Sequence, residues 1–426
     1  MKRWVSWVLA LAMVTMTLLP ASAEAVPQSA TPETAVTQET QTEDDQKAIT
    51  GTYGVLSYTV NDDGTSCSIT DCDTSAKGEL EIPEKIDGYK VTIIGVDAFY
   101  GCNALTSVTI PEGVTSIGKC AFWSCGNLTS INIPQGVTSI GEYAFWSCES
   151  LTSITIPEGV TSIGENAFED CSSLTSITIP QSVTSIEKGV FWKCSSLTSI
   201  TIPESVTSIG SYAFNECWRL TSITIPESVT SIDDHAFLDC WRLTSIVIPK
   251  GVTSIAGGTF ENCGSLTSVV IPDSVTRIGE EAFSKCSSLT SMTIPESVTR
   301  IDSGAFKNCK SLISITIPDS VTSIGWGTFR DCSSLTSITI PGSVTSIGGY
   351  AFSGCNQLKD VYYGGTQEEK DAISVDNDND PLLNATWHCK PTGPEVLPDV
   401  EVSKTARVHY FNSWDAEKRL LTGIIM

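Results

Sequence analysis

Cysteine recurs at intervals of 23 residues over most of this 426-residue chain, with no insertion between one copy and the next. The periodic cysteines are residues 102, 125, 148, 171, 194, 217, 240, 263, 286, 309, 332 and 355. Phenylalanine keeps the same step from Phe99 to Phe352, and leucine keeps it from Leu105 to Leu358. A fixed period of about 20 to 29 residues is typical of leucine-rich solenoids, in which each copy covers the open face of its neighbour.

Residues 174–194 represent one copy. The stretch 176–179 alternates polar and apolar residues, as a strand with one buried face does, and Pro180 ends it because proline cannot donate to a ladder. Val183 and Ile186 form a second apolar pair, which predicts a short strand or an extended turn. The last apolar positions follow helical spacing and predict one inward-facing helical turn: Val190, Phe191 and Cys194. We therefore expect an α/β repeat solenoid with parallel strands on a concave face and short strands and one-turn helices on the other side.

The first residues have the layout of an export signal. Lys2 and Arg3 precede a mostly apolar run at 5–19, and residues 21–23 read Ala-Ser-Ala, which predicts a cleavage site. The apolar run is shorter than the ~20 residues that a membrane-spanning helix needs. We expect a signal peptide and, after its removal, no membrane insertion. The predicted domains are a signal peptide at 1–23, a disordered spacer at 24–50, an N-terminal cap and first repeat at 51–101, the solenoid at 102–358, a C-terminal cap at 359–390, and a tail or truncated module at 391–426.

The copies read L-T-S-I-T-I-P-x-x-V-T-S-I-x-x-x-A-F-x-x-C. This pattern closely resembles the bacterial BspA-like leucine-rich repeat family over roughly residues 79–358. It departs from the general leucine-rich repeat, which has Asn or Cys just after the strand, because this chain has Gly or Ser there, as in Gly136 and Ser182. The resemblance implies a secreted or cell-surface protein. The better-known members are adhesins that bind host proteins or other bacteria.

Charged residues are few and mostly acidic: 25 Lys and Arg stand against 49 Asp and Glu, for a formal charge of −24. Nucleic acid and anionic lipid both require basic surfaces, so this balance argues against either partner. The chain has only three histidines, and we find no G-x-S-x-G, H-E-x-x-H or phosphate-cradling glycine loop. We therefore expect no enzyme activity, no cofactor and no metal site.

Two other patterns favour ordinary structural roles. The acidic run from Asp376 to Asp380 is spaced like the start of a calcium loop, but Pro381 and Trp387 stand where Gly and Glu are needed, which favours a solvated loop. His235 replaces tyrosines of other copies, which favours surface variation.

The periodic cysteines follow the inward-facing phenylalanines, which predicts a reduced and buried ladder. Equivalent side chains of parallel turns point the same way, which is poor geometry for disulfides, although a disulfide or metal ladder is the alternative. Four cysteines lie off the ladder: Cys67, Cys72, Cys120 and Cys389. A bridge between Cys67 and Cys72 is open at this point.

Comparison of the copies separates scaffold from variation. One outward strand row is serine in every copy from Ser107 to Ser337, and the next row is threonine except at Asn132, Val247 and Val270. This predicts a face coated with hydroxyl groups, which either meets solvent or binds a repeating ligand such as a glycan. Ice binding is a third alternative, which the expected curvature disfavours.

Large aromatic residues occur at positions that other copies fill with Ser, Lys or Glu. The candidate ligand-binding residues are Tyr100, Trp123, Trp146, Trp192, Trp218, Arg219, Trp241 and Arg242. Trp and Arg are common binding hot spots, and neighbouring copies place such rings about 5 Å apart. We therefore expect a surface scaffold that binds an extracellular protein or glycan. Two alternatives remain: the rings only pack against one another, and the solenoid is a spacer that presents another module. The sequence does not indicate an oligomeric state.

Overall fold

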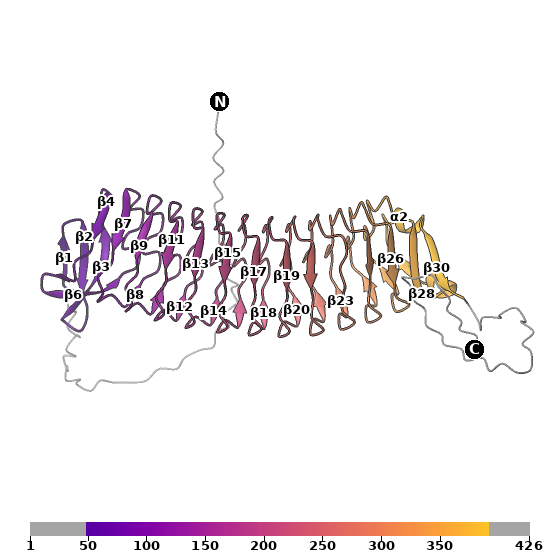
Figure 1. Cartoon of the computed structure of the whole chain (residues 1–426), viewed down its shortest axis with the longest axis horizontal. Helices are drawn as coiled ribbons and strands as arrows, with labels where there is room; N and C mark the ends of the chain where they lie inside the picture. Colours follow the sequence, from indigo (N-terminus) through magenta and orange to yellow (C-terminus); the bar gives the residue numbers. More distant parts are fainter. Residues whose placement is uncertain (1–47, 392–426) are drawn as a thin grey trace, which may run out of the picture. The chain divides into compact units, whose positions relative to one another are not determined.

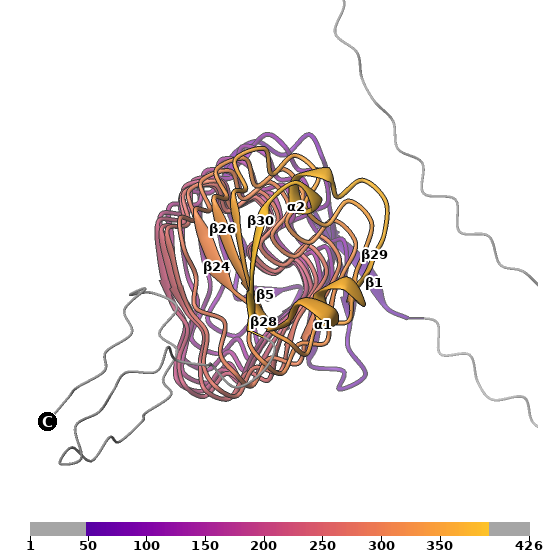
Figure 2. The same cartoon turned by 90° about the vertical axis from the view of Figure 1, so that its right-hand side faces the viewer.

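The computed structural model describes residues 48–391, which form one stack of turns (Figure 1). The predicted signal peptide at 1–23, nearly all of the predicted spacer at 24–50 and all but the first residue of the predicted tail lie outside the described residues. Figure 2 looks along the stack and shows turn superposed on turn, with β24, β26 and β30 on one side and β29 on the other.

Most strands of the first row lie at or just after a conserved leucine, although none forms after Leu289. The strands of this row pair in parallel within four separate sheets. Its strands are β4 (Gly78–Glu81), β7 (Leu105–Thr109), β9 (Ser130–Asn132), β11 (Ser153–Thr155), β13 (Ser176–Thr178), β15 (Ser199–Thr201), β17 (Ser222–Thr224), β19 (Ser245–Val247), β21 (Ser268–Val270), β24 (Ser314–Thr316) and β26 (Ser337–Ile340). Equivalent residues of neighbouring copies face each other, as in Ser153 with Ser176 and Ile154 with Ile177. The register of the stack is therefore the period of the sequence. The placement of this row on a concave face stays a prediction.

The second row follows the proline and consists of two-residue strands, apart from the longer first one. Its strands are β6 (Tyr89–Ile94), β8 (Ser116–Ile117), β10 (Ser139–Ile140), β12 (Ser162–Ile163), β14 (Ser185–Ile186), β16 (Ser208–Ile209), β18 (Ser231–Ile232), β20 (Ser254–Ile255), β22 (Arg277–Ile278), β23 (Arg300–Ile301), β25 (Ser323–Ile324) and β27 (Ser346–Ile347). The predicted second strand is thus confirmed.

Both ends of the stack carry caps. The N-terminal cap is formed by β1 (Thr50–Tyr53), β2 (Leu56–Val60) and β3 (Ser66–Cys72), which pair antiparallel in that order. In the first repeat, β5 (Lys85–Ile86) pairs antiparallel with β6, so that the two strands form a hairpin. The C-terminal cap contains β28 (Asp360–Thr366), α1 (Gln367–Asp371), β29 (Ser374–Val375), α2 (Asp380–Leu383) and β30 (Thr386–Lys390).

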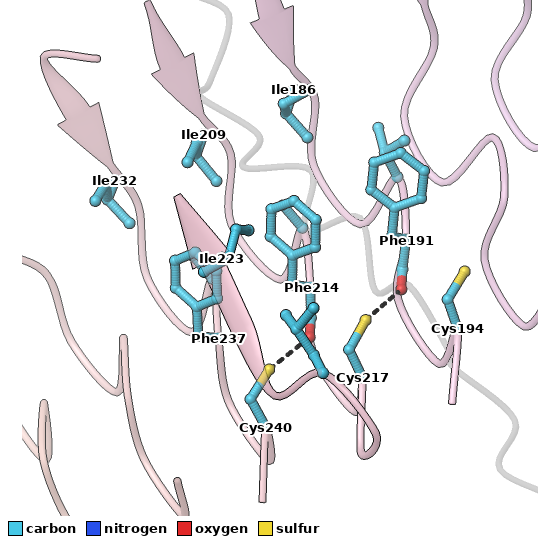
Figure 3. Packing of buried hydrophobic residues seen from close by; sticks show 14 of the residues in the cluster. Ile186, Phe191, Cys194, Ile209, Phe214, Cys217, Ile223, Ile232, Phe237 and Cys240 are labelled. Atoms are coloured by element: carbon cyan, nitrogen blue, oxygen red, sulfur yellow. Dashed lines mark hydrogen bonds between the residues drawn. The ribbon is translucent and has the colours of Figure 1, made fainter. Parts of the chain in front are cut away.

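A ladder of phenylalanines runs through the core. The twelve rings from Phe99 to Phe352 are fully buried, and successive rings are stacked with centroids 4.8–6.0 Å apart. The periodic cysteines lie beside this ladder, as Figure 3 shows for Cys194, Cys217 and Cys240. All twelve are free and buried, as expected. A core of this kind is continuous along the stack, because each copy closes the face of the next.

The predicted one-turn helix of each repeat is wrong, and the structure has turns there instead. Tyr212 and Glu216 adopt the left-handed backbone conformation, with φ of 59° and 58°, and the equivalent two positions of the other copies do the same. The amides of Tyr212, Phe214 and Glu216 donate to carbonyl oxygens of the next turn at 3.1, 2.8 and 2.9 Å. A helix would direct these amides back along its own axis. Alternating left-handed residues direct them to the neighbouring copy, so the segment forms a third ladder. In the described chain, the helices α1 and α2 both belong to the C-terminal cap.

The off-ladder cysteines are free as well, so the open Cys67–Cys72 bridge is not formed. Both residues lie in β3, five positions apart. At about 3.3 Å per residue, this separation far exceeds the distance that a disulfide spans. Cys120 occupies one of the left-handed positions, with φ of 55°.

Candidate binding surface

Two tryptophan–arginine pairs stand at the tips of neighbouring turns. Trp218 and Arg219 lie between two fully buried residues, Cys217 and Leu220. The Leu220 amide donates to the Cys217 carbonyl at 3.0 Å. This tight turn holds its two ends in the core and leaves its two middle side chains outside. Trp241 and Arg242 repeat the arrangement one copy later. The tryptophans retain 45% and 53% of their surface, so the scaffold does not use them as core.

The two tryptophan rings are stacked. Their centroids are 6.1 Å apart with 28° between the ring planes. The Trp241 indole nitrogen donates to a carboxylate oxygen of Asp239 at 3.1 Å, which orients that ring. The Asn262 amide also donates to Asp239, so the carboxylate is itself held in place.

Within residues 48–391, neither of the two arginines that follow these tryptophans has an ion pair. Of the five arginines in residues 48–391, the other three are paired: Arg277 and Arg300 with Asp302, and Arg330 with Asp331. Arg219 and Arg242 are exposed to solvent. In a chain this acidic, unpaired guanidinium groups beside exposed rings leave donors available for a ligand.

A second aromatic cluster lies on the turn side of the first copies. Trp123 stacks on Trp146 with centroids 4.5 Å apart and 15° between planes, and Tyr100 meets Trp123 edge-on at 5.0 Å. Tyr143, which the sequence comparison did not select, lies 5.2 Å from Trp146. The Lys119 ammonium pairs with Glu142 at 2.6 Å and lies 5.7 Å from the Tyr143 ring centre. Both tryptophans are half-buried, so these rings pack against one another.

Trp192 does not join that cluster, because the intervening copy carries Glu169 at the equivalent position. Glu169 is 7% exposed, and burial raises the pKa of its carboxyl to about 7. Trp192 instead stacks on Tyr212 at 5.6 Å, and Tyr212 stacks on His235 at 5.0 Å. The Trp192 indole donates to Glu216 at 3.3 Å. The eight candidate residues therefore fall into three groups rather than one continuous row.

The comparison of copies also missed a group near the C-terminal end. Trp326 lies 5.6 Å from Tyr350, and the Arg330 guanidinium lies 5.9 and 5.4 Å from the two ring centres. Tyr350 occupies the same position of the repeat as Tyr143 and Tyr212. A comparison of the copies at this position could therefore have identified the group.

The hydroxyl-coated face is confirmed as outward-facing on the first row of strands. Ser153 and Thr155 of β11 are exposed on either side of buried Ile154. Val247 and Val270 interrupt the threonine row as neighbours in β19 and β21, and they are 58% and 57% exposed. Valine in place of threonine at these two positions adds exposed apolar surface on adjacent copies.

The acidic run in the C-terminal cap is not a solvated loop throughout. Asn379 is buried, accepts a hydrogen bond from the Phe352 amide at 2.9 Å and donates to the Gly348 carbonyl at 3.0 Å. The run therefore ties the cap to the last repeat. Within residues 48–391, no group of three or more His, Cys, Asp or Glu side chains is arranged to hold a metal ion. Nor does any helix in this part of the chain have the length and apolar character to cross a membrane.

A family model described as "BspA type Leucine rich repeat region (6 copies)" matches residues 78–195, 161–286 and 253–372. These matches cover well over half of the chain. The chain belongs to the BspA-type leucine-rich repeat family. The resemblance read from the repeat pattern is thereby confirmed, together with the stacked-strand solenoid.

Solved structures agree with the BspA-type assignment. A leucine-rich repeat protein from Bacteroides ovatus has a TM-score of 0.60 and 29% identity, over 80% of this chain and 100% of that one. The pneumococcal vaccine antigen PcpA has a TM-score of 0.57 and 18% identity, over 81% of this chain and 99% of that one, which shows a shared fold. No protein of curated function matches the chain.

The BspA-type repeat of this chain also explains its Gly or Ser after the strand. The hydroxyl groups of Ser205 and Ser228 each donate to a valine carbonyl of the preceding turn at 2.7 Å. At Gly136, an added Cβ would lie 3.2 Å from the Val114 carbonyl oxygen. A larger side chain would have to displace that backbone, so small residues suit the position.

Proposed function

We propose that this BspA-type protein is an exported bacterial surface scaffold that binds an extracellular protein or glycan and has no enzymatic activity. Export rests on the signal-like layout of residues 1–23. The surface role rests on the family, whose solenoids are typically interaction scaffolds, and on a family match that indicates no enzyme.

The observation that carries the proposal is the pair of exposed tryptophans, each followed by an arginine without an ion pair. Hot spots of protein interfaces are enriched in Trp and Arg. The fold does not need two large rings that are about half exposed, because every other copy has a small or polar residue at this position, as in Ser195 and Gly264. We therefore assign binding to the Trp–Arg patch, defined as Trp218, Arg219, Trp241 and Arg242.

The test is binding of the secreted chain to immobilised extracellular proteins and glycans. The double variant Trp218→Ser/Trp241→Ser is expected to weaken binding by about 2 kcal/mol or more, which is at least ~30-fold in Kd, with the melting temperature unchanged. A matched control, Trp123→Ser/Trp146→Ser, makes the same two Trp→Ser changes in the packed cluster. Equal losses of binding in both variants would overturn the assignment of the patch.

A structural spacer is the second candidate. Its support is the uniform Ser and Thr face of the first-row strands, which offers the same surface at copy after copy. A spacer is expected to show no tryptophan-dependent binding in the same screen.

A further inference from the structure

The Trp–Arg patch consists of two copies of one pair, displaced by a single turn of the stack. Neighbouring copies carry Ser195-Ser196 on one side and Gly264-Ser265 on the other, so the repeat of the pair is confined to two turns. The rings lie 6.1 Å apart, which is the displacement between the two halves of the patch. A ligand that engages both halves in the same way must itself repeat at about this step.

The charge of the patch is opposite to that of the chain. Arg219 and Arg242 are exposed and lack an ion pair within the described residues, in a protein with a formal charge of −24. The acidic residues closest to them in sequence form hydrogen bonds with other side chains and not with these arginines: Glu216 accepts from the Trp192 indole, and Asp239 accepts from Trp241, within the patch, and from Asn262. Both guanidinium groups are therefore free to pair with carboxylates of a ligand, to which arginine binds in a fixed two-pronged geometry.

We propose that the patch binds a linear polysaccharide of uronic acid units, which runs along the stack with its sugar rings on the two indoles and its carboxylates on the two guanidinium groups. This inference rests on the proposed function and names the ligand class of the same site. A pyranose ring has an apolar C–H face that packs on an aromatic ring, while its equatorial carboxylate projects sideways. One sugar unit advances by about one turn of the solenoid, whose strands repeat at about 4.8 Å.

Other occupants match the patch less well. A folded protein surface has no reason to present the same anchor twice at a one-turn step. An acidic peptide repeats its carboxylates, but its flexible side chains offer the indoles little apolar surface. A neutral glycan fits the rings and leaves both arginines without partners. The joint presence of stacked rings and unpaired arginines is what favours an acidic sugar chain.

The experiment measures the affinity of the secreted chain for sodium polygalacturonate by titration calorimetry, beside the same polymer with its carboxylates reduced to alcohols. Loss of one arginine–carboxylate contact corresponds to about tenfold in Kd, so Arg219→Gln and Arg242→Gln are each expected to weaken binding about tenfold. Trp218→Ser/Trp241→Ser is expected to abolish binding, and added salt is expected to weaken it. The control Arg300→Gln removes an equal charge from the second row, where Arg277 still pairs with Asp302.

Each outcome decides between specific alternatives. Equal effects of Arg300→Gln and Arg242→Gln would reveal non-specific attraction and overturn the inference. Tryptophan-dependent binding of the reduced polymer, or of poly-glutamate in preference to polygalacturonate, would overturn the acidic sugar chain and leave the proposed function standing. If neither these polymers nor the immobilised proteins and glycans bind in a tryptophan-dependent way, both proposals fall.

Discussion

Each ladder cysteine contributes more than a small apolar volume. The thiols from Cys125 to Cys355 each donate to the phenylalanine carbonyl of the preceding turn, with sulfur–oxygen distances of 3.0–3.3 Å. Figure 3 shows two of these bonds, from Cys217 to Phe191 and from Cys240 to Phe214. A side chain that is small, apolar and able to donate suits a position beside a buried carbonyl, which explains why cysteine fills this row.

Burial of this ladder predicts a loss of stability at alkaline pH. Burial raises the pKa of the Cys125 thiol from 9.0 to about 12 and that of Cys148 well above 9.0. The native thiols stay protonated where those of the unfolded chain ionise, so the stabilisation is complete below pH 9 and is lost as pH rises from 9 towards 12. Denaturant unfolding measured at pH 7, 9 and 10.5 is expected to show a falling midpoint over the last interval.

Reaction with a thiol reagent tests separately whether the ladder thiols are buried and reduced. The ladder thiols are expected to resist the reagent in the native protein and to react once denaturant is added, because only the exposed thiolate is reactive. Mass spectrometry that finds disulfide-linked copies in the native protein would contradict a reduced ladder.

At the scale of the element, the turn segment depends on two left-handed positions per copy. Non-glycine residues occupy many of them, including Tyr143, Tyr212 and His235, and each accepts the cost of that conformation. The gain is the ladder of amides donated to the next turn. At two of the positions that glycine occupies, a side chain of the preceding copy lies over the glycine: His235 covers Gly258 and Asn166 covers Gly189.

Two glycine substitutions separate backbone strain from steric conflict. Gly327→Ala is expected to cost about 1–2 kcal/mol of unfolding free energy, since its φ is 59° and an added Cβ has only the Arg330 Cβ within 4 Å, at 3.8 Å. Gly258→Ala has a similar φ of 57°, but its Cβ would lie 2.1 Å from the His235 ring, so a larger loss is expected. Because His235→Ala also removes the stacking on Tyr212, the two effects are compared in that background: Gly258→Ala added to His235→Ala is expected to cost about as much as Gly327→Ala costs in the native chain. Equal losses for the two single variants would refute the steric part.

The cluster around Trp123 and Trp146 is expected to be a packing element. Aromatic pairs of this geometry contribute about 0.5–1.5 kcal/mol beyond burial, so Trp123→Ser/Trp146→Ser is expected to lower the unfolding free energy by at least about 1 kcal/mol. Thermal and denaturant unfolding measure the effect, with Trp218→Ser/Trp241→Ser as the control that changes it little. A variant that melts like the native chain would return these rings to the list of binding candidates.

At the scale of the whole molecule, contacts are made between neighbouring turns. The parallel pairs join residues 23 positions apart along both strand rows, as in Ser208 with Ser231 and Ile209 with Ile232. Stability of such a stack is approximately a sum over copies and their interfaces. The caps β1–β3 and β28–β30 close the two ends of this array.

This organisation predicts that deletion of one whole copy, Leu220 to Arg242, leaves a shorter folded solenoid. Deletion of 11 residues from the same copy is expected to break the register and unfold the stack locally, because facing positions no longer match. Circular dichroism and thermal melts of the two deletion variants check this. Indistinguishable melts would be incompatible with a register set by the 23-residue period.

The sequence by itself determined the period, the identity of the buried rows and the register of both strand ladders, because identical copies can bury identical faces only when they stack in step. It also selected tryptophans that other copies manage without, but it did not distinguish the exposed Trp218 and Trp241 from Trp123 and Trp146, which pack on each other. Backbone hydrogen bonding along the stack was not visible in it. The apolar spacing around Val190 and Cys194 fits a helix and a pair of turns equally well. Only the backbone hydrogen bonds that the amides of this segment donate to the next copy show that it forms turns.

The grouping of the site was likewise decided by tertiary structure. Row positions place Trp146 and Trp192 two copies apart, but burial of Glu169 between them separates the two clusters. Ion pairing depends on side-chain direction in neighbouring turns, so only the structure distinguishes the unpaired Arg219 and Arg242 from the paired Arg277 and Arg300. Periodicity specifies where each residue stands in the stack, whereas contacts across turns determine which side chains are left for a ligand.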